Sequence, residues 1–186
     1  MCDVRCAKRQ SHVSNLKSQI SYLIKMNKIK RIALVAHDNR KVDLIEWVEW
    51  NWEILIKHQL ICTGTTGRLV EEALNRKKEE NNNIRTLNIT KLKSGPLGGD
   101  QQLGAMICDG DIDVLIFFWD PMQPQPHDVD VKALLRISVL YNVVTACSRA
   151  TADFIISSPL LDGQYTPIIK DYKAYINREV VVRESV

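Results

Sequence analysis

The 186-residue chain lacks a long apolar run, paired cysteines and a strong charge of one sign. No segment approaches the roughly 18 consecutive apolar residues that a membrane-spanning helix needs. Residues 1–30 contain neither the apolar block nor the cleavage pattern of a secretion signal. The net charge is only +3 and the basic residues are scattered, which argues against a nucleic-acid surface. These absences favour a soluble, single-domain protein, and we expect it in the cytoplasm.

The cysteines and histidines exclude further classes of protein. The five cysteines, an odd number without a C-x-x-C spacing, are Cys2, Cys6, Cys62, Cys108 and Cys147. Such a set fits neither a disulfide framework nor a zinc site. The histidines and acids also lack a ligand spacing such as H-x-x-x-H. No G-x-G-x-x-G follows the first apolar segment, and no G-x-S-x-G is present. We therefore expect neither a metal nor another cofactor.

Short apolar segments alternate with amphipathic ones from Arg31 onward. The expected strands are Ile32–Ala36, Gln59–Cys62, Asn88–Leu92, Val114–Phe118 and Val143–Ala146. The segments expected to be helical are marked by the stripe Ile45, Val48, Trp52 and Leu55, and by residues 69–74, 101–108, 131–139 and 151–157. This alternation predicts parallel strands joined by right-handed crossovers. The fold class is therefore α/β, a doubly wound five-stranded sheet with helices on both faces.

Two segments depart from this alternation. Residues 1–30 form an N-terminal extension, in which apolar residues recur at the spacing of an amphipathic helix, namely Val13, Leu16, Ile20, Leu23 and Ile24. Docking of a partner and simple packing are both open interpretations of this extension. The stretch Arg76–Thr90 is polar and of low complexity, and is expected to be a surface loop.

Residues suited to chemistry follow four of the expected strands. These segments are His37–Asp38, Thr63–Gly67, Ser94–Asp100 and Asp120–His127. The carboxyl ends of parallel strands share one edge of the sheet, and ligands of doubly wound proteins bind there. The loops at the opposite edge carry nothing comparable. This clustering predicts a ligand site at the carboxyl edge.

The Thr63–Gly67 segment suits an anionic ligand. Glycine lets the backbone approach a phosphate closely, and three hydroxyls can donate together with the N–H groups of the following helix. A plain strand-to-helix turn is the alternative, but such a turn does not need three threonines. The segment therefore predicts a small phosphorylated ligand.

The charged residues at this edge each have a structural alternative. Asp38 and Asp100 stand where a helix cap is favoured, and Asp120 precedes a proline that suits a turn. Lys41 suits a solvated helix charge. His127 follows two prolines, which would hold its imidazole in place at a low entropic cost. For these residues, taken singly, structural and chemical roles both remain open.

In their common order, these segments resemble the methylglyoxal synthase family. The similar blocks are Ala33–Asp38, Thr63–Gly67, Ser94–Gln102, Asp120–His127, Asp130–Arg136 and Ala150–Asp153. The resemblance implies a domain over residues 31–178, an extension before it, and a tail over residues 179–186. The stretch between Gly67 and Ser94 is longer than the family's, and Cys147-Ser148 stands where Thr-Asn is usual.

The resemblance implies an activity and a set of site residues. Members of the family are homohexameric, metal-free lyases that convert dihydroxyacetone phosphate to methylglyoxal and inorganic phosphate. Asp100 would be the base that forms an enediolate, and His127 the donor to its oxygen. Three further acids match active-site positions, namely Asp38, Asp120 and Asp130. The implied substrate-binding residues are His37, Lys41, Thr63, Gly64, Thr65, Thr66, Ser94, Gly95, His127 and Arg178.

A non-catalytic regulatory module is the alternative function. The fold also resembles the allosteric domain of carbamoyl phosphate synthetase, in which phosphorylated effectors bind without reacting. A phosphate-binding turn suits both functions, but an effector site needs neither Asp100 nor His127. If the chain is a lyase, we expect Asp100 to face the Thr63–Thr66 turn across one cavity.

Overall fold

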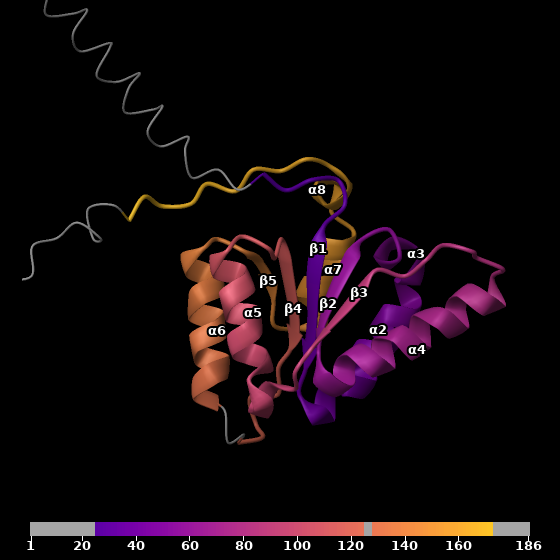
Figure 1. The fold of residues 1–186 in the computed structure, drawn as a ribbon, viewed down its shortest axis with the longest axis horizontal. Coiled ribbons are helices and arrows are strands. Elements are labelled where there is room, and N and C mark those ends of the chain that lie inside the picture. The colour runs from indigo at the N-terminus through magenta and orange to yellow at the C-terminus, as the bar shows by residue number, and fades with distance from the viewer. Residues whose placement is uncertain (1–24, 125–127, 173–186) are drawn as a thin grey trace, which may run out of the picture.

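The computed structural model describes residues 25–124 and 128–172 (Figure 1). The strands form one sheet in the order β3-β2-β1-β4-β5, and every neighbouring pair is parallel. They are β1 (Arg31–Ala36), β2 (Gln59–Thr63), β3 (Ile89–Leu92), β4 (Val114–Phe118) and β5 (Val144–Ala146). The predicted five-stranded α/β sheet is confirmed, and each strand lies within one residue of its expected bounds.

Helices cover both faces of this sheet (Figure 1). On one face lie α5 (Gly99–Cys108) and α6 (Asp128–Leu140). On the other lie α2 (Lys41–Trp50), α3 (Trp52–Leu55), α4 (Gly64–Glu80), α7 (Arg149–Ile156) and α8 (Pro159–Asp162). Two 3₁₀ turns, η1 (Asp38–Arg40) and η2 (Gly95–Leu97), follow β1 and β3. No helix in the described part of the chain is long and apolar enough to cross a bilayer.

The continuous apolar sequence of β1 follows from this layering. Ile32 and Leu34 pack into the core beneath α2, α4 and α7. Ala33 and Val35 point to the other face and pack beneath α5 and α6. A strand in the middle of a doubly wound sheet buries both sets of side chains, so it does not alternate apolar and polar residues.

The stripe from Ile45 to Leu55 was predicted as one helix, and this was wrong. The structure divides it into α2 and α3 at Asn51, whose side-chain amide donates to the carbonyl of Trp47 at 2.9 Å. Asparagine side chains compete in this way with backbone hydrogen bonding and favour helix ends. The spacing of apolar residues alone does not record such a break.

The expected loop over residues 76–90 was wrong in its first five residues. Helix α4 continues through Glu80, and Lys77 and Glu80 form an ion pair of 2.8 Å along it. Asn81 ends the helix by donating its side-chain amide to the carbonyl of Lys77. Charged pairs at this spacing stabilise a solvated helix without an apolar stripe, which explains why a polar segment was mistaken for a loop.

A buried histidine adjoins the opposite, amino edge of the sheet. His58 is 4% exposed, and its Nδ1 accepts the backbone N–H of Lys30 at 3.1 Å. Burial lowers the pKa of His58 from its ordinary value of 6.5, and the positive charges of Lys30, Lys57 and Arg85 lower it further, while Asp162 opposes them. The unfolded chain therefore binds a proton more readily than the folded chain. The stabilising effect of a neutral His58 is present above about pH 6.5 and is lost as the pH falls below it.

We expect a His58→Gln variant to lose less stability on acidification than the original chain. Glutamine keeps an acceptor for the Lys30 N–H but has no proton to bind. The measurement is the urea midpoint of unfolding at about pH 7.5 and about pH 5.5 for both proteins. Because the other histidines are common to both, the difference isolates residue 58. Equal pH slopes in the two proteins would contradict the assignment.

Candidate functional site

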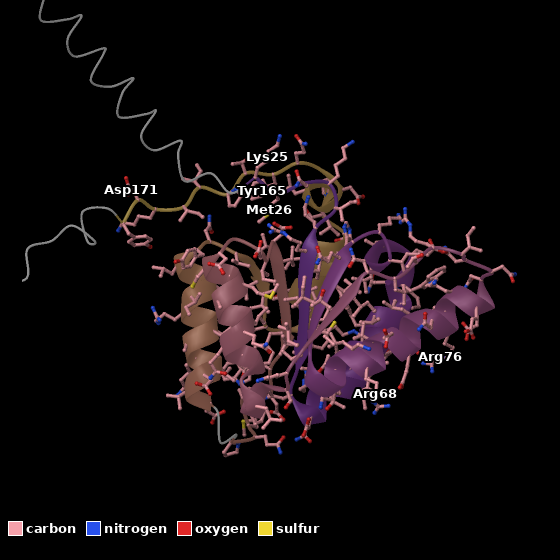
Figure 2. All side chains as sticks on the ribbon, in the orientation of Figure 1. Lys25, Met26, Arg68, Arg76, Tyr165 and Asp171 are labelled. Carbon is pink, nitrogen blue, oxygen red and sulfur yellow. The ribbon has the colours of Figure 1, made fainter. Side chains whose placement is uncertain are left out.

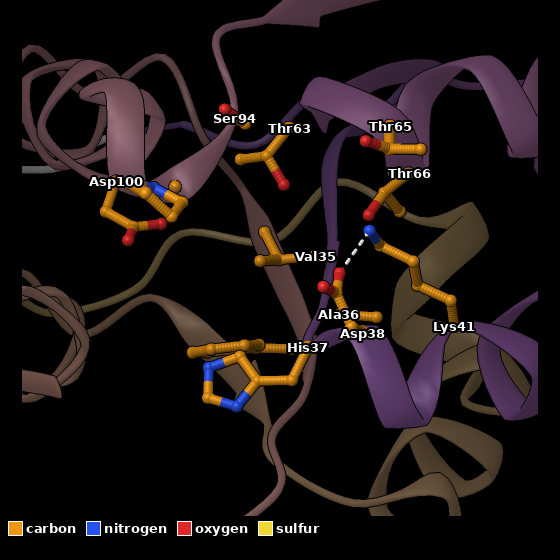
Figure 3. A pocket seen from close by; sticks show the side chains of 13 residues that line it. Val35, Ala36, His37, Asp38, Lys41, Thr63, Thr65, Thr66, Ser94 and Asp100 are labelled. Atoms are coloured by element: carbon orange, nitrogen blue, oxygen red, sulfur yellow. Dashed lines mark hydrogen bonds and ion pairs between the residues drawn. The ribbon is translucent and has the colours of Figure 1, made fainter. Parts of the chain in front are cut away.

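A cavity of about 200 Å³ lies at the carboxyl edge of the sheet, beside the ends of β1 and β4 (Figure 3). The chain reverses its winding direction between these two strands, and ligands bind at such switch points. The expected residues that line the cavity are His37, Asp38, Lys41, Thr63, Thr65, Thr66, Ser94, Gly95 and Asp100. The structure therefore brings Asp100 and the threonine turn to one cavity.

The threonine turn is the beginning of α4. The first turn of a helix has N–H groups without intrahelical partners, and its dipole favours an anion. Gly64 starts this turn at a φ of +36°, and its N–H donates to the carbonyl of Lys93 at 3.1 Å. A Cβ on Gly64 would lie 2.6 Å from the Cα of Ser94. Glycine is thus required for the β2 and β3 loops to meet beside the cavity.

Asp100 is placed by the loop that follows β3. Gly98 adopts a φ of +94°, and a Cβ on Gly99 would lie 2.1 Å from the carbonyl oxygen of Lys93. These glycines let α5 begin directly against the β3 loop. Asp100 then falls in the first turn of α5, is only 5% exposed, and lines the same cavity as the threonines.

The hydrogen bonds of His37 determine where its neutral ring carries a proton. His37 is 6% exposed, and its Nδ1 accepts the backbone N–H of Asp120 at 3.4 Å. Its ring meets Phe117 edge-on, with the ring centroids 5.2 Å apart. Because Nδ1 is an acceptor, a neutral His37 carries its hydrogen on Nε2. It is then able to donate to a ligand oxygen through that atom.

Lys41 supplies a positive charge to the cavity wall. Its Nζ lies 2.5 Å from Oδ1 of Asp38, and Figure 3 shows the lysine pointing toward Thr66. The lysine side chain is 20% exposed, whereas that of Asp38 is 84% exposed. The ammonium group is therefore the more enclosed partner and is held beside the helix end that favours an anion.

Five expected residues are not among those that line this cavity, and one of them, Gly64, instead joins the β2 and β3 loops beside it. Asp120 lies beside Asp128 and Lys132 in a neighbouring hollow, and Asp130 lines a groove between α5 and α6 that Asp100 also reaches. His127 and Arg178 lie outside the described residues. The pKa of Asp120 is held below its ordinary value, chiefly by the N–H of Met122, which donates at 3.0 Å.

The sequence did not single out two residues that shape the site. Phe117 lines the cavity and supports the ring of His37. Asn39 donates to Oδ2 of Asp120 at 3.3 Å and so joins the loops after β1 and β4. For Phe117 the alternation of faces along a predicted strand was a usable signal. In the structure Phe117 pairs with Val35 and points to the same face of the sheet. Asn39 had no comparable signal.

Cys62 lies directly before the threonine turn and is buried. Burial raises the pKa of its thiol to about 12, so the group stays protonated near neutral pH and is a poor nucleophile. Across residues 25–124 and 128–172, no group of three or more His, Cys, Asp or Glu side chains is arranged to hold a metal ion.

The fold and the cavity define a doubly wound α/β protein with a cavity at its switch point that is lined by the start of a helix. Residues 43–147 match the family model described as the MGS-like domain. The chain is 56% identical to the methylglyoxal synthase of Maridesulfovibrio salexigens over 159 residues, which cover 83% of this chain and 100% of that protein. It is 51% identical to the methylglyoxal synthase of Coxiella burnetii over 150 residues, covering 81% of this chain and 97% of that one.

A crystal structure of methylglyoxal synthase from Elizabethkingia anophelis NUHP1 has a similar fold, with a TM-score of 0.75. Its sequence is 49% identical, and the match covers 84% of this chain and 96% of that chain. The chain belongs to the methylglyoxal synthase family.

Proposed function

We propose that this protein is a lyase that converts dihydroxyacetone phosphate to methylglyoxal and inorganic phosphate. The observation that carries the proposal is a single cavity lined by both an anion-binding helix start and a buried carboxylate, that of Asp100. The names of the relatives, which are methylglyoxal synthases at about half identical residues, support the same reaction.

Asp100 acts first, as the general base. It removes a proton from the carbon that bears the free hydroxyl, and the electron pair of that C–H bond moves to form an enediolate. His127 and His37 are the donors to the oxygen on which negative charge develops. The Nε2 hydrogen of a neutral His37 suits this role, because its Nδ1 is already occupied by the Asp120 N–H.

The enediolate then expels phosphate from the adjacent carbon. As the C–O bond to phosphate breaks, the hydroxyl on the deprotonated carbon loses its proton and becomes the aldehyde C=O, while the C=C bond shifts to the carbon that carried phosphate. The resulting enol gains a proton on that terminal carbon and loses one from its oxygen to become methylglyoxal. The leaving dianion is held by the hydroxyls and amides of the threonine turn and by the charge of Lys41. This turn consists of Thr63, Gly64, Thr65 and Thr66, and Ser94 and Gly95 are further substrate-binding residues.

Four further residues are assigned to the active site by resemblance to the family. We assign Asp38, Asp120 and Asp130 as accessory acids of the active site, and Arg178 as a further phosphate contact. By resemblance to the family, the enzyme is a cytoplasmic homohexamer. Light scattering would then give a mass about six times that of the 21.3 kDa chain.

The reaction itself is tested by incubating the protein with dihydroxyacetone phosphate. We expect free phosphate and a trapped dicarbonyl to appear in equal amounts, each in proportion to the amount of enzyme. Binding of the substrate without release of either product would instead identify a regulatory module.

We expect a Lys41→Met variant to lose about 10- to 100-fold in kcat/KM, the range typical of losing one charge-assisted hydrogen bond to phosphate. Steady-state release of phosphate measures the effect. Lys57→Met is a matched control, because Lys57 is exposed at the amino edge of the sheet. An unchanged kcat/KM in Lys41→Met would remove Lys41 from the phosphate site.

A further inference from the structure

An apolar groove lies at the amino edge of the sheet, opposite the carboxyl edge that carries the proposed active site. Its volume is about 270 Å³, and its walls come from α7, α8, the first residues of β4 and β5, and the chain just before β1. Its apolar lining includes Met26, Val114, Val144, Phe154, Ile155 and Leu160. Phe154 is 81% exposed and Leu160 57% exposed. Large apolar side chains that are exposed together around one groove are typical of a surface that another segment or molecule covers.

The groove is preformed because the segment before β1 is fixed in place. Met26 pairs with Tyr165, its N–H donating to the tyrosine carbonyl at 2.8 Å, and Figure 2 shows both beside Lys25. The buried ammonium of Lys30 donates to the carbonyls of Asn27 and Gly163. These contacts hold the chain before β1, which forms one wall of the groove, against the residues that follow α8.

The residues that precede this segment carry a matching apolar face. At 100° per residue, the side chains of a helix over residues 13–24 would place five apolar residues within an arc of about 100°. These five are Val13, Leu16, Ile20, Leu23 and Ile24. The opposite face would carry Asn15, Ser18 and Tyr22. Such a helix has one face suited to an apolar groove and one suited to water.

We propose that residues 13–24 fold back as an amphipathic helix and dock into this groove of their own chain. The segment joins the described chain at Lys25, next to Met26, which itself forms part of the groove wall. This direct connection gives the segment a high effective concentration at the groove, which a second molecule lacks. Docking would cover Phe154 and Leu160 and leave the carboxyl-edge cavity untouched.

Hydrogen–deuterium exchange of the full chain, followed by mass spectrometry, tests the docking from both sides. We expect amides of residues 13–24 to exchange about tenfold or more slowly in the original chain than in a Phe154→Asp variant. Ile84→Asp is the matched control, since Ile84 is 99% exposed and lies outside the groove, and it is expected to leave the protection intact.

The reciprocal variants change the segment instead of the groove. Leu16→Asp with Ile20→Asp is expected to speed exchange in α7 and α8, whereas Asn15→Asp with Ser18→Asp adds the same charge to the polar face and is expected to have no effect. A photo-reactive residue at position 160 should cross-link to residues 13–24 within one chain. Protection that is absent, or that survives Phe154→Asp, or cross-links formed only between two chains, would overturn the proposal.

Discussion

Replacement of Asp100 by asparagine should reduce turnover of dihydroxyacetone phosphate by about 10²- to 10⁴-fold, the range expected for the loss of a general base. Asparagine has nearly the same shape as aspartate, so the packing of this 5%-exposed side chain is retained. Steady-state phosphate release measures the loss. The binding of 2-phosphoglycolate, a phosphorylated mimic of the enediolate, should persist because the threonine turn is unchanged.

Asp109→Asn is the control for this substitution. Asp109 is exposed at the other end of the same helix, α5, and does not line the cavity. It should have the turnover of the original enzyme. Normal turnover in Asp100→Asn would exclude Asp100 as the base, and loss of both turnover and mimic binding would indicate that the residue instead builds the site.

Substitution of Gly64 by alanine should both destabilise the protein and impair the site. The backbone there has a φ of +36°, and the new Cβ would stand 2.6 Å from the Cα of Ser94. Strain and overpacking together should lower the free energy of unfolding by about 2–4 kcal/mol. The two loops would also be forced apart, and a displacement of about 1 Å at a site can lower kcat/KM by about 10²-fold.

Gly104→Ala provides the comparison for Gly64→Ala. Gly104 lies within α5, and a Cβ there would meet the Cδ1 of Ile137 at an ordinary 3.7 Å. Alanine also favours a helix interior over glycine, so stability should stay the same or rise slightly. Urea unfolding and kcat/KM are measured for both variants. Equal behaviour of the two would show that contact between the β2 and β3 loops is unimportant.

Much of the fold could be predicted because it depends on simple burial. The strand Val114–Phe118 is apolar throughout since both of its faces are covered, and its bounds were predicted without error. The clustering of Thr63 and Asp100 at one edge follows equally from parallel topology. These features require only that the strands alternate with helices.

The remaining features depend on contacts between residues distant in the sequence or on local hydrogen bonds. Nothing in the composition shows that Asn51 interrupts a helix, or that Asn39 reaches Asp120. Strand topology also did not determine which acids reach the main cavity, and Asp120 and Asp130 line neighbouring hollows instead. Loop paths decide the contacts of Asn39 and Asp120, and the packing of α6 against α5 decides where Asp130 lies.

The hydrogen bond between His37 and residue 120 involves the backbone of that residue and not its charged side chain. The donor to the imidazole is the peptide N–H of residue 120, while the carboxylate of Asp120 faces Asn39 and Met122. Any amino acid other than proline would supply the same donor. The orientation of the ring therefore depends on the backbone at this position, and whatever the carboxylate of Asp120 contributes to the reaction is separate from it.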